Sequence, residues 1–524
     1  CGDCGVKSNC VSIQPVETEF GRKRRIDQSS CNKDFSCIDG FCPSFVTVHG
    51  GKIRKAGGVA GDIDPLDGVA EPAPFPLGRD GWSAVVDGVG GTGVVTVGAV
   101  IGMAAHLEGK GCGMIDMAGL AQKGGSVFTH VRVAATPGDI HAIRVSAGKA
   151  DLVLGCDLVV SGAKKVLAAV RENHTVFVAN TAEVMPGEFT RQADFSLPAE
   201  RLKKAIRAAA GESNAHFFDA TRTATALFGD SLGANMFLLG LAYQHGGVPL
   251  SAEAIERAIG LNGQAIAMNV AAFRWGRRAA HQPDFVKSLV GSQAGPAREK
   301  PAAATLDDGI ARRAAFLASY RNAAYARRYA DRIAALRAAE GRAVPGSTAV
   351  TERAVKSLFK LMAVKDEYEV ARLYTDGSFA RELAGQFQSY DRIEFHLAPP
   401  ILGRRDADGR PKKSSFGPWM MTAMRCLAML KGLRGTPFDP FGYSAERRLE
   451  QRLLAQYEGD LDLIEQHLCA AKVEAAAGLA AVPELVRGYG HVKQAAVKKA
   501  AAERLRLVER LVEAQAEPSL RAAE

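Results

Sequence analysis

The stretch that decides the fold is WSAVVDGVGGTGVVTVGAV, residues 82–100. Its first part, Trp82–Asp87, is an apolar run that predicts a buried strand. It continues into Gly88, Val89, Gly90, Gly91, Thr92 and Gly93, and an apolar helical pattern begins at Val94. A G-x-G-x-x-G loop between a strand and a helix permits a tight turn and directs the first helical amides toward a phosphate or another anion. The stretch therefore predicts a β-α unit that binds a ligand at the end of its strand.

Further strand and helix patterns alternate on the carboxyl side of this unit. The expected strands are Gly113–Met117, Val127–Val133, Leu152–Val160, Thr175–Ala179 and His216–Asp219. This alternation predicts a Rossmann-like, mostly parallel α/β domain over residues 81–290.

A second Gly-rich loop follows the second expected strand. The residues of this loop that we expect to contact a ligand are Gln122, Gly124, Gly125 and Ser126. We expect this loop at the carboxyl edge of the sheet, where α/β proteins bind ligands. Asp116 lies about 20 residues after Gly93, where a ribose-binding acid would sit, so a nicotinamide dinucleotide is a rival ligand. Glycines that serve tight packing alone are the other alternative for both loops.

Six of the ten cysteines lie near the start of the chain: Cys1, Cys4, Cys10, Cys31, Cys37 and Cys42. Thiolates at short spacing can converge on an iron–sulfur cluster, and Cys42 is followed by Pro43, as in the closing Cys-Pro of bacterial ferredoxins. Two expected hairpins, 11–30 turning at residues 21–23 and 44–55 turning at residues 50–51, complete a ferredoxin-like segment over residues 1–57. Six thiols leave the number of clusters open. A zinc ribbon and a disulfide set are the alternatives.

The remaining divisions follow from composition. Residues 58–80 are rich in Pro and Gly and are predicted to be a linker. Residues 307–524 are rich in Ala, Arg, Leu and Glu, with helical periodicity that predicts a mainly helical domain, apart from an expected strand at Arg392–Leu397. Four isolated cysteines in apolar or helical surroundings are expected to be buried structural thiols: Cys112, Cys156, Cys426 and Cys469.

Charge and hydropathy exclude several classes of function. The 524 residues include 66 Lys and Arg against 57 Asp and Glu, a net charge of +9. This mild excess suits an acidic partner but gives little support to nucleic-acid binding. No apolar run reaches the ~20 residues of a membrane span, and no signal-peptide pattern is present. We therefore expect a cytoplasmic protein that binds neither nucleic acid nor membrane. The thiamine-diphosphate signature, Gly-Asp-Gly followed by a distant Asn, is also absent from the sequence.

In combination, these motifs resemble one family over essentially the whole chain. Residues 1–48 closely resemble the iron–sulfur segment of the fused bacterial indolepyruvate ferredoxin oxidoreductases, and the loops at Gly88–Gly93 and Ala121–Val127 resemble the gamma domain of the 2-oxoacid:ferredoxin oxidoreductases. Further similar stretches are KDEYEVARLYTDGSF (365–379), FHLAPPILGRRD (395–406), FGPWM (416–420), RGTPFDPFGYSAERR (434–448) and RGYGHVK (487–493). These stretches resemble the C-terminal helical domain of the same proteins.

The resemblance implies an activity, cofactors and partners. Such enzymes convert aryl 2-oxoacids to aryl-acetyl-CoA with thiamine diphosphate and Mg²⁺, pass electrons through [4Fe–4S] clusters to ferredoxin, and use coenzyme A as co-substrate. The six N-terminal cysteines would be cluster ligands, and the two Gly-rich loops would face the thiamine and coenzyme A region. The basic stretch Arg22–Arg25 would dock ferredoxin, unless it is simply a solvated turn. A homo-oligomer is also expected.

The family's thiamine-binding domains lie upstream of these segments, so the resemblance also implies that residues 1–524 are inactive without them. The start at Cys1 agrees with a cut through a ligand set. An NAD(P)-linked iron–sulfur oxidoreductase and a zinc-stabilised scaffold protein are the alternative functions.

Overall fold

The structure is a computed structural model that describes residues 2–10, 12–28, 31, 33–54, 63–73, 75–118, 125–185, 195–293, 305–399, 404–405, 411–488 and 490–513. It divides into two compact units. The first unit comprises residues 1–8, 35–54 and 298–524, and the second comprises residues 9–34 and 55–297. The division runs through the Cys-rich segment, which we expected to form one module over residues 1–57.

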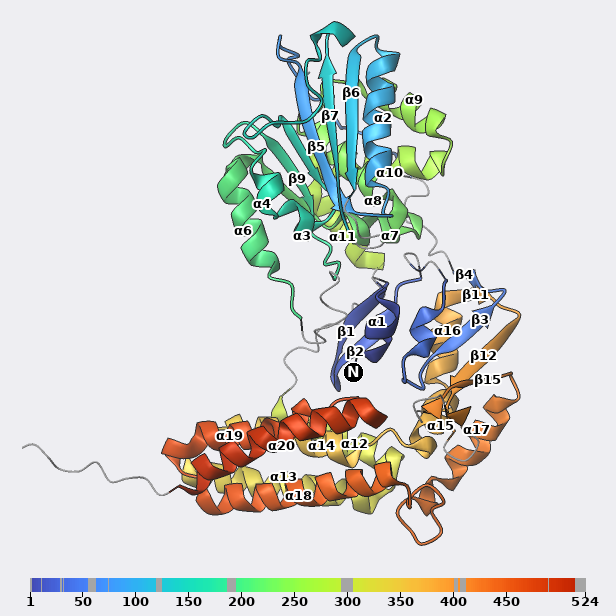
Figure 1. Cartoon of the computed structure of the whole chain (residues 1–524), viewed down its shortest axis with the longest axis vertical. Coiled ribbons are helices and arrows are strands. Elements are labelled where there is room, and N and C mark those ends of the chain that lie inside the picture. Colours follow the sequence, from blue (N-terminus) through green and yellow to red (C-terminus); the bar gives the residue numbers. More distant parts are fainter. Residues whose placement is uncertain are drawn as a thin grey trace, which may run out of the picture. The chain divides into compact units, whose positions relative to one another are not determined.

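The second unit is built on a six-stranded sheet with the order β10-β9-β8-β5-β7-β6 (Figure 1). The strands are β5 (Trp82–Val89), β6 (Gly111–Ala118), β7 (Ser126–Ala134), β8 (Leu152–Gly155), β9 (Val176–Asn180) and β10 (Ala215–Phe218). Strands β5, β8, β9 and β10 pair in parallel, whereas β7 pairs antiparallel with both β5 and β6. The mostly parallel α/β fold predicted from the sequence is confirmed.

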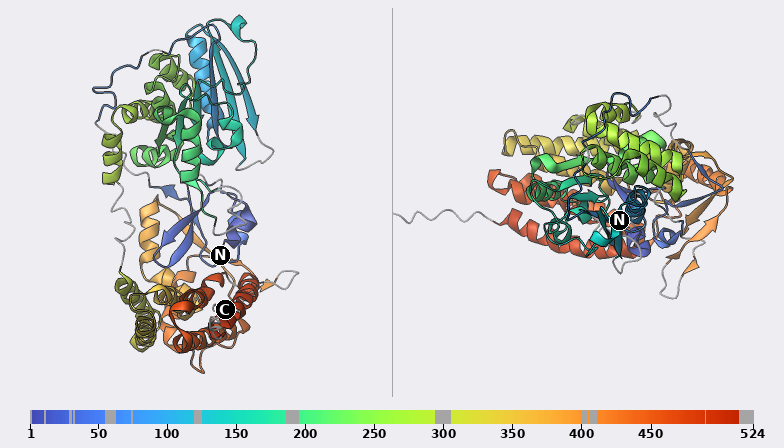
Figure 2. Two further views of the ribbon diagram at one scale, coloured as in Figure 1. Left: turned by 90° about the vertical axis from the view of Figure 1, so that its left-hand side faces the viewer. Right: turned by 90° about the horizontal axis from the view of Figure 1, so that it is seen from above.

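Side chains alternate between two apolar layers along these strands. Trp82, Ala84 and Val86 of β5 pack in one core with the helices that follow the Gly-rich loop and β10, whereas Val85 packs on the opposite face. The first layer contains α2 (Val94–Leu107), α7 (Ala220–Phe228), α8 (Ala234–Gln244), α9 (Ala252–Asn262) and α10 (Ile266–His281), followed by α11 (Pro283–Gln293). The opposite layer contains α3 (Leu158–Ser161), α4 (Lys164–Leu167) and α6 (Ala199–Ala210). Figure 2 shows the helices after β10, in green, as a layer beside the strands.

The expected strand Leu152–Val160 is too long. Strand β8 ends at Gly155, and Asp157 then caps α3 by accepting hydrogen bonds from the amides of Val159 and Val160, both at 2.9 Å. An apolar run alone does not separate a buried strand from a buried helix, which is why the sequence pattern predicts a single strand here.

The first expected hairpin is present in the second unit. Strands β1 (Ile13–Thr18) and β2 (Gly21–Ile26) pair antiparallel, and the turn lies at residues 19–20 rather than at residues 21–23. The second expected hairpin is wrong. Its strands β3 (Val46–His49) and β4 (Lys52–Ile53) flank residues 50–51 as expected, but β3 pairs with β12 and β4 with β11 of the C-terminal region.

The first unit is mainly helical, as predicted. Figure 1 shows several of its long helices side by side, and α14 contacts α13, α18 and α19. Its helices are α1 (Asp3–Ser8), α12 (Leu306–Tyr320), α13 (Ala323–Ala343), α14 (Ala349–Met362), α15 (Glu367–Thr375), α16 (Ser378–Gln386), α17 (Met420–Met429), α18 (Ala445–His467), α19 (Val473–Ala481) and α20 (Gly490–Val512). Its C-terminal strands are β11 (Phe387–Ser389), β12 (Arg392–Leu397), β13 (Arg404–Arg405), β14 (Pro411–Lys412) and β15 (Ser414–Phe416).

Two further observations bear on the expectations from sequence. Among the described residues, no helix is long and apolar enough to span a bilayer. The isolated cysteines differ in exposure: Cys156 is buried, Cys112 and Cys469 are half-buried, and Cys426 is exposed. The prediction of a buried thiol is therefore wrong for Cys426, which lies in α17.

Candidate functional site

The G-x-G-x-x-G loop lies between β5 and α2, as predicted. A side chain on Gly88 would have its Cβ 2.7 Å from Val94 Cγ2 and 3.0 Å from Cys156 Cβ, so the strand end can approach α2 and β8 only without one. Gly93, which precedes the first helical residue, has φ +87°, a conformation that favours glycine. Gly91, Thr92 and Gly93 are exposed, so the amino end of α2 is open to a ligand.

The structure brings the described part of the second Gly-rich loop to the first. Gly90 N–H donates to the Gly125 carbonyl at 2.8 Å, and Ser126 pairs with Val89 across β5 and β7. Both loops therefore lie at the carboxyl end of β5. Gln122 and Gly124 lie outside the described residues, so their predicted roles are not addressed by the geometry.

Asn235 holds the first loop in place, and sequence reasoning missed it. Its side-chain amide donates to the Thr92 carbonyl at 2.7 Å, and Thr92 Oγ1 donates to the Val89 carbonyl at 2.7 Å. Asn235 is buried at the start of α8, a helix that is otherwise apolar there. A single amide at the head of an apolar helix was the only signal for it in the sequence.

A buried carboxyl group lies directly beneath the loop. Asp87, the last residue before Gly88, is fully buried; Ser161 Oγ donates to its Oδ1 at 2.8 Å, and its Oδ2 has no hydrogen-bond partner within the described part of the chain. Burial raises the pKa of Asp87 well above its usual range, and the neighbouring Asp157 raises it further, while the Ser161 hydrogen bond opposes both. The geometry therefore favours a neutral, protonated carboxyl group that links β5 to α3.

Replacing Asp87 by Asn should stabilise the protein at neutral and alkaline pH. Because the pKa of Asp87 is raised in the folded protein, its carboxyl group stabilises the fold fully only at a pH below its pKa in the unfolded chain. This contribution to the free energy of unfolding is lost as the pH rises through the pKa of the folded state. Asn stays neutral throughout, so we expect Asp87→Asn to gain about 1–3 kcal/mol of unfolding free energy near pH 8, the scale of a poorly satisfied buried group. Urea unfolding between pH 4 and pH 8 measures it. Asp80→Asn, which removes an exposed carboxyl group, is the matched control. If the free energy of unfolding depends on pH in the same way for wild type and Asp87→Asn, the neutral state of Asp87 in the fold is disproved.

The described cysteines of the N-terminal segment are divided between the two units. Cys4 in α1 is buried, and Cys37 and Cys42, in and after the short helix η1 (Ser36–Asp39), are half-buried; all three belong to the first unit. Cys10 and Cys31, both half-buried, belong to the second unit, and Cys1 lies outside the described residues. No group of three or more His, Cys, Asp or Glu at metal-binding distance occurs among the residues that the structure describes.

The chemistry of the first-unit thiols fits one side of an iron–sulfur cluster. The short helix η1 approaches α1 so closely that a Cβ on Gly40 would lie 2.7 Å from Cys4 Cα. Asp3 Oδ2 accepts a hydrogen bond from Phe41 N–H at 2.7 Å, which ties the same two segments together. Cys4 and the Cys37–Cys42 stretch are thereby held in one part of the unit, as ligands on one side of a cluster must be.

Part of the chain is similar to proteins of known name. The "Indolepyruvate oxidoreductase subunit IorB" of Methanothermobacter thermautotrophicus is 31% identical over 201 residues, which cover 38% of this chain and 97% of that protein. The chain belongs to the 2-oxoacid:ferredoxin oxidoreductase family. A protein of the same name from Pyrococcus horikoshii is 29% identical over 205 residues, covering 38% of this chain and 96% of that protein.

Family models divide the chain between two descriptions. Residues 83–279 match "Pyruvate ferredoxin/flavodoxin oxidoreductase", and residues 306–506 match "Family of unknown function (DUF6537)". The family assignment thus agrees with the resemblance inferred from the sequence, and this member of the 2-oxoacid:ferredoxin oxidoreductases is an oxidoreductase subunit whose C-terminal region matches a family of unknown function.

Two solved structures are also similar to parts of this family member. The gamma subunit of a keto/oxoacid ferredoxin oxidoreductase from Geobacter sulfurreducens is 20% identical, with a TM-score of 0.28, covering 38% of this chain and 98% of that chain. A 2-oxoglutarate:ferredoxin oxidoreductase from Magnetococcus marinus, solved with 2-oxoglutarate, coenzyme A and succinyl-CoA, is 16% identical, with a TM-score of 0.28, covering 57% of this chain and 46% of that chain.

The position of Asp116 does not favour a nicotinamide dinucleotide. In dinucleotide-binding folds the ribose-binding acid follows a strand that lies beside the first strand. Here Asp116 lies on β6, and the antiparallel strand β7 separates β6 from β5. Asp116 Oδ1 instead accepts a hydrogen bond from Thr129 Oγ1 at 2.6 Å.

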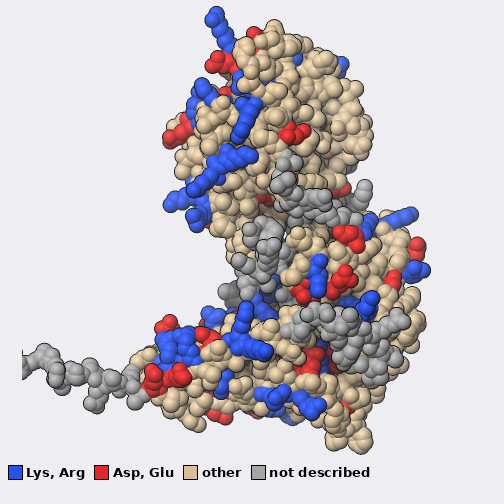
Figure 3. Space-filling view, viewed as in Figure 1, with Lys and Arg blue, Asp and Glu red and all other residues tan. Residues whose placement is uncertain are grey.

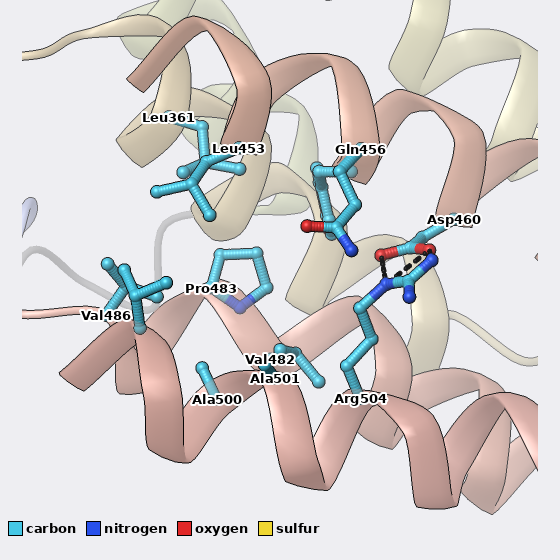
Figure 4. Close-up of a pocket in the computed structure, with 12 residues that line it drawn as sticks. Leu361, Leu453, Gln456, Asp460, Val482, Pro483, Val486, Ala500, Ala501 and Arg504 are labelled. Atoms are coloured by element: carbon cyan, nitrogen blue, oxygen red, sulfur yellow. Dashed lines mark hydrogen bonds and ion pairs between the residues drawn. The ribbon is translucent and has the colours of Figure 1, made fainter. Parts of the chain in front are cut away.

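A pocket in the C-terminal region offers no comparable site. It lies between α18, α20 and the short helix η7 (Val482–Leu485), and Figure 4 shows the Asp460 carboxylate directed at Arg504 across it. The Arg504 Nε and Nη2 atoms donate to Asp460 at 2.6–2.9 Å, so both charges are compensated. Most of the other lining side chains are apolar: Leu361, Leu453, Val482, Pro483, Val486, Val497, Ala500 and Ala501. We assign this pocket to helix packing.

Proposed function

We propose that this chain is the electron-transferring and gamma-domain part of an aryl 2-oxoacid:ferredoxin oxidoreductase that acts on indolepyruvate or a related arylpyruvate. In the proposed reaction the C1–C2 bond of the oxoacid breaks, CO₂ leaves, the acyl group passes to the sulfur of coenzyme A with release of the thiol proton, and two electrons reach ferredoxin through [4Fe–4S] clusters. Thiamine diphosphate, with Mg²⁺, supplies the carbanion chemistry when bound. It would be bound by thiamine-binding domains that act together with this chain.

One observation carries the proposal: the similarity extends over 97% of a relative named indolepyruvate oxidoreductase subunit, and a Cys-rich segment precedes the matching domain in the same chain. The geometry supports it at two places. The two Gly-rich loops meet at the carboxyl end of β5, where they would face the thiamine and coenzyme A region. Cys4, Cys37 and Cys42 lie in one unit and would be cluster ligands, with Cys1, Cys10 and Cys31 as the others.

The charge distribution suits an acidic electron acceptor. Strand β2 carries the basic stretch Arg22–Arg25, in which Lys23 and Arg25 are exposed. Figure 3 shows further Lys and Arg side chains gathered on the side of the second unit that carries α4 and α6. Their exposed members are Lys164, Lys165, Arg201 and Lys204. Ferredoxin, as an acidic protein, would dock by this complementarity, and the docking should weaken as ionic strength rises.

The proposal predicts iron, but no complete reaction, in the purified chain. After anaerobic purification we expect iron and acid-labile sulfide, with a brown colour that dithionite bleaches. Arylpyruvate-dependent viologen reduction should require added thiamine-binding domains of the same enzyme. Stoichiometric zinc without iron would contradict the electron-transfer role, and viologen reduction by residues 1–524 alone would contradict the division of labour.

A further inference from the structure

The C-terminal region of unknown function and the second half of the Cys-rich segment share their sheets. Strand β3 pairs antiparallel with β12, from Val46 opposite Phe395 to His49 opposite Arg392. Strand β4 pairs with β11, where Ile53 lies opposite Phe387. The edges of β3 and β4 are thus completed by strands from residues 387–397, which match the family of unknown function.

Tyr374 of this region contacts the Cys-Pro motif. Its hydroxyl group donates to the Pro43 carbonyl at 3.0 Å, one residue from Cys42. The ring is buried against Phe379 and Phe395, with ring centroids 5.0 and 5.3 Å away. Burial raises the pKa of Tyr374, and Cys42 adds to the shift, so the hydroxyl group remains a donor. It therefore fixes the backbone beside one predicted cluster ligand.

Lys413, which lies between β14 and β15, contacts the segment that carries Cys37. Its Nζ donates to the Ile38 carbonyl at 2.9 Å, one residue from Cys37, and lies 5.1 Å from the centre of the Phe45 ring. Burial lowers the pKa of Lys413, while the negative charges of Cys42, Cys4, Asp3 and Cys37 raise it. A half-buried ammonium group is thus held one residue from the predicted ligand Cys37.

We propose that the C-terminal region supports the iron–sulfur segment, with Tyr374 and Lys413 as its positioning residues. The inference rests on the proposed function, because it requires a cluster on Cys4, Cys37 and Cys42. Tyr374 holds the Cys42-Pro43 backbone, and Lys413 places a positive charge beside the thiolates. A cluster gains negative charge on reduction, and a nearby cation in a poorly solvated place favours the reduced state. Lys413 therefore raises the reduction potential of the cluster.

The test is a redox titration of the full 524-residue chain, reconstituted anaerobically with iron and sulfide and followed by electron paramagnetic resonance. We expect Lys413→Met to lower the midpoint potential by the equivalent of about tenfold in the reduction equilibrium, 59 mV for one electron. Lys413→Arg, which keeps the charge, should stay near the wild-type value. Lys412→Met, which removes an exposed charge from the adjacent position, is the matched control. A Lys413→Met potential equal to wild type, at equal iron content, would overturn the inference.

A second variant keeps the inference testable if Lys413→Met does not fold. Tyr374→Phe removes one hydroxyl group and leaves the ring, so helical content should be unchanged. The loss of one hydrogen bond of about 1 kcal/mol corresponds to a roughly fivefold faster loss of iron to a chelator. An unchanged rate would overturn the support role. A wild-type chain that takes up no iron refutes the proposed function itself, and the iron assay reveals this before any variant is compared.

Discussion

Gly240→Ala should destabilise the second unit by about 3 kcal/mol of unfolding free energy or more, the range of severe overpacking. Helices α8 and α10 cross with their backbones in contact. A Cβ on Gly240 would lie 1.9 Å from the Phe273 carbonyl oxygen, and a Cβ on Gly276 would lie 1.9 Å from the Phe237 carbonyl oxygen. Backbone atoms cannot rotate aside as a flexible side chain can, so the helices would have to separate.

Separation would be costly because this crossing is the centre of the larger apolar core. Phe237, Phe273 and Trp275 are almost completely buried there, together with the Trp82 end of β5. Moving α8 would also pull Asn235 away from the Thr92 carbonyl, so the Gly-rich loop should lose its support in the same variant.

Gly260→Ala is the matched control. Gly260 lies in α9 with open space at its Cβ position, so this variant should gain about 0.5–1 kcal/mol from helix propensity. Urea unfolding followed by circular dichroism measures both variants. A Gly240→Ala protein within about 0.5 kcal/mol of wild type, the range of ordinary surface substitutions, would refute the close crossing.

Local patterns predicted where several strands of this fold lie. Strand β12 spans Arg392–Leu397, the expected residues, and β5 begins at Trp82 as expected. The expected strand Leu152–Val160 is too long because this stretch is apolar apart from Asp157, and Asp157, as a helix cap, was the signal for the end of β8.

Strand partners could not be predicted, because pairing depends on residues far apart in the sequence. The turn at residues 50–51 is local, but β3 and β4 complete their pairing with strands of the C-terminal region, and no local pattern near residue 50 indicates this. The expected ferredoxin-like hairpin was therefore wrong in its pairing while its bend was right.

The candidate site was predictable only in its repeated features. Glycines at fixed spacing and clustered cysteines form patterns, and the two Gly-rich loops do meet at the carboxyl end of β5. Asp87, Asn235, Tyr374 and Lys413 are single residues, and each acquires its role from a contact with a distant segment. Asp87 had one available signal, an acid at the end of an otherwise apolar strand.

Cys37→Ser should remove most of the iron from the reconstituted chain and abolish the brown colour that dithionite bleaches. The thiolate is the ligand that iron–sulfur clusters require, and a serine hydroxyl group at neutral pH is a poor substitute. Cys37 lies one residue from the Ile38 carbonyl that Lys413 holds, and η1 packs against the α1 segment that carries Cys4. The loss of this one thiol should therefore affect the ligand group that the first unit holds together.

Cys426→Ser is the control, because Cys426 is exposed on α17, away from the Cys-rich segment in sequence, and should keep wild-type iron content. Iron, sulfide and zinc are measured together, because their contents distinguish an iron–sulfur cluster from a zinc site. Iron retained equally by Cys37→Ser and Cys426→Ser would exclude Cys37 as a ligand. Zinc in the wild-type chain that is lost in Cys37→Ser would show a tetrahedral thiolate site of the zinc-ribbon kind instead. Such a site has no electron to pass on, because Zn²⁺ has no redox chemistry, and the electron-transfer role would then fall to another part of the enzyme.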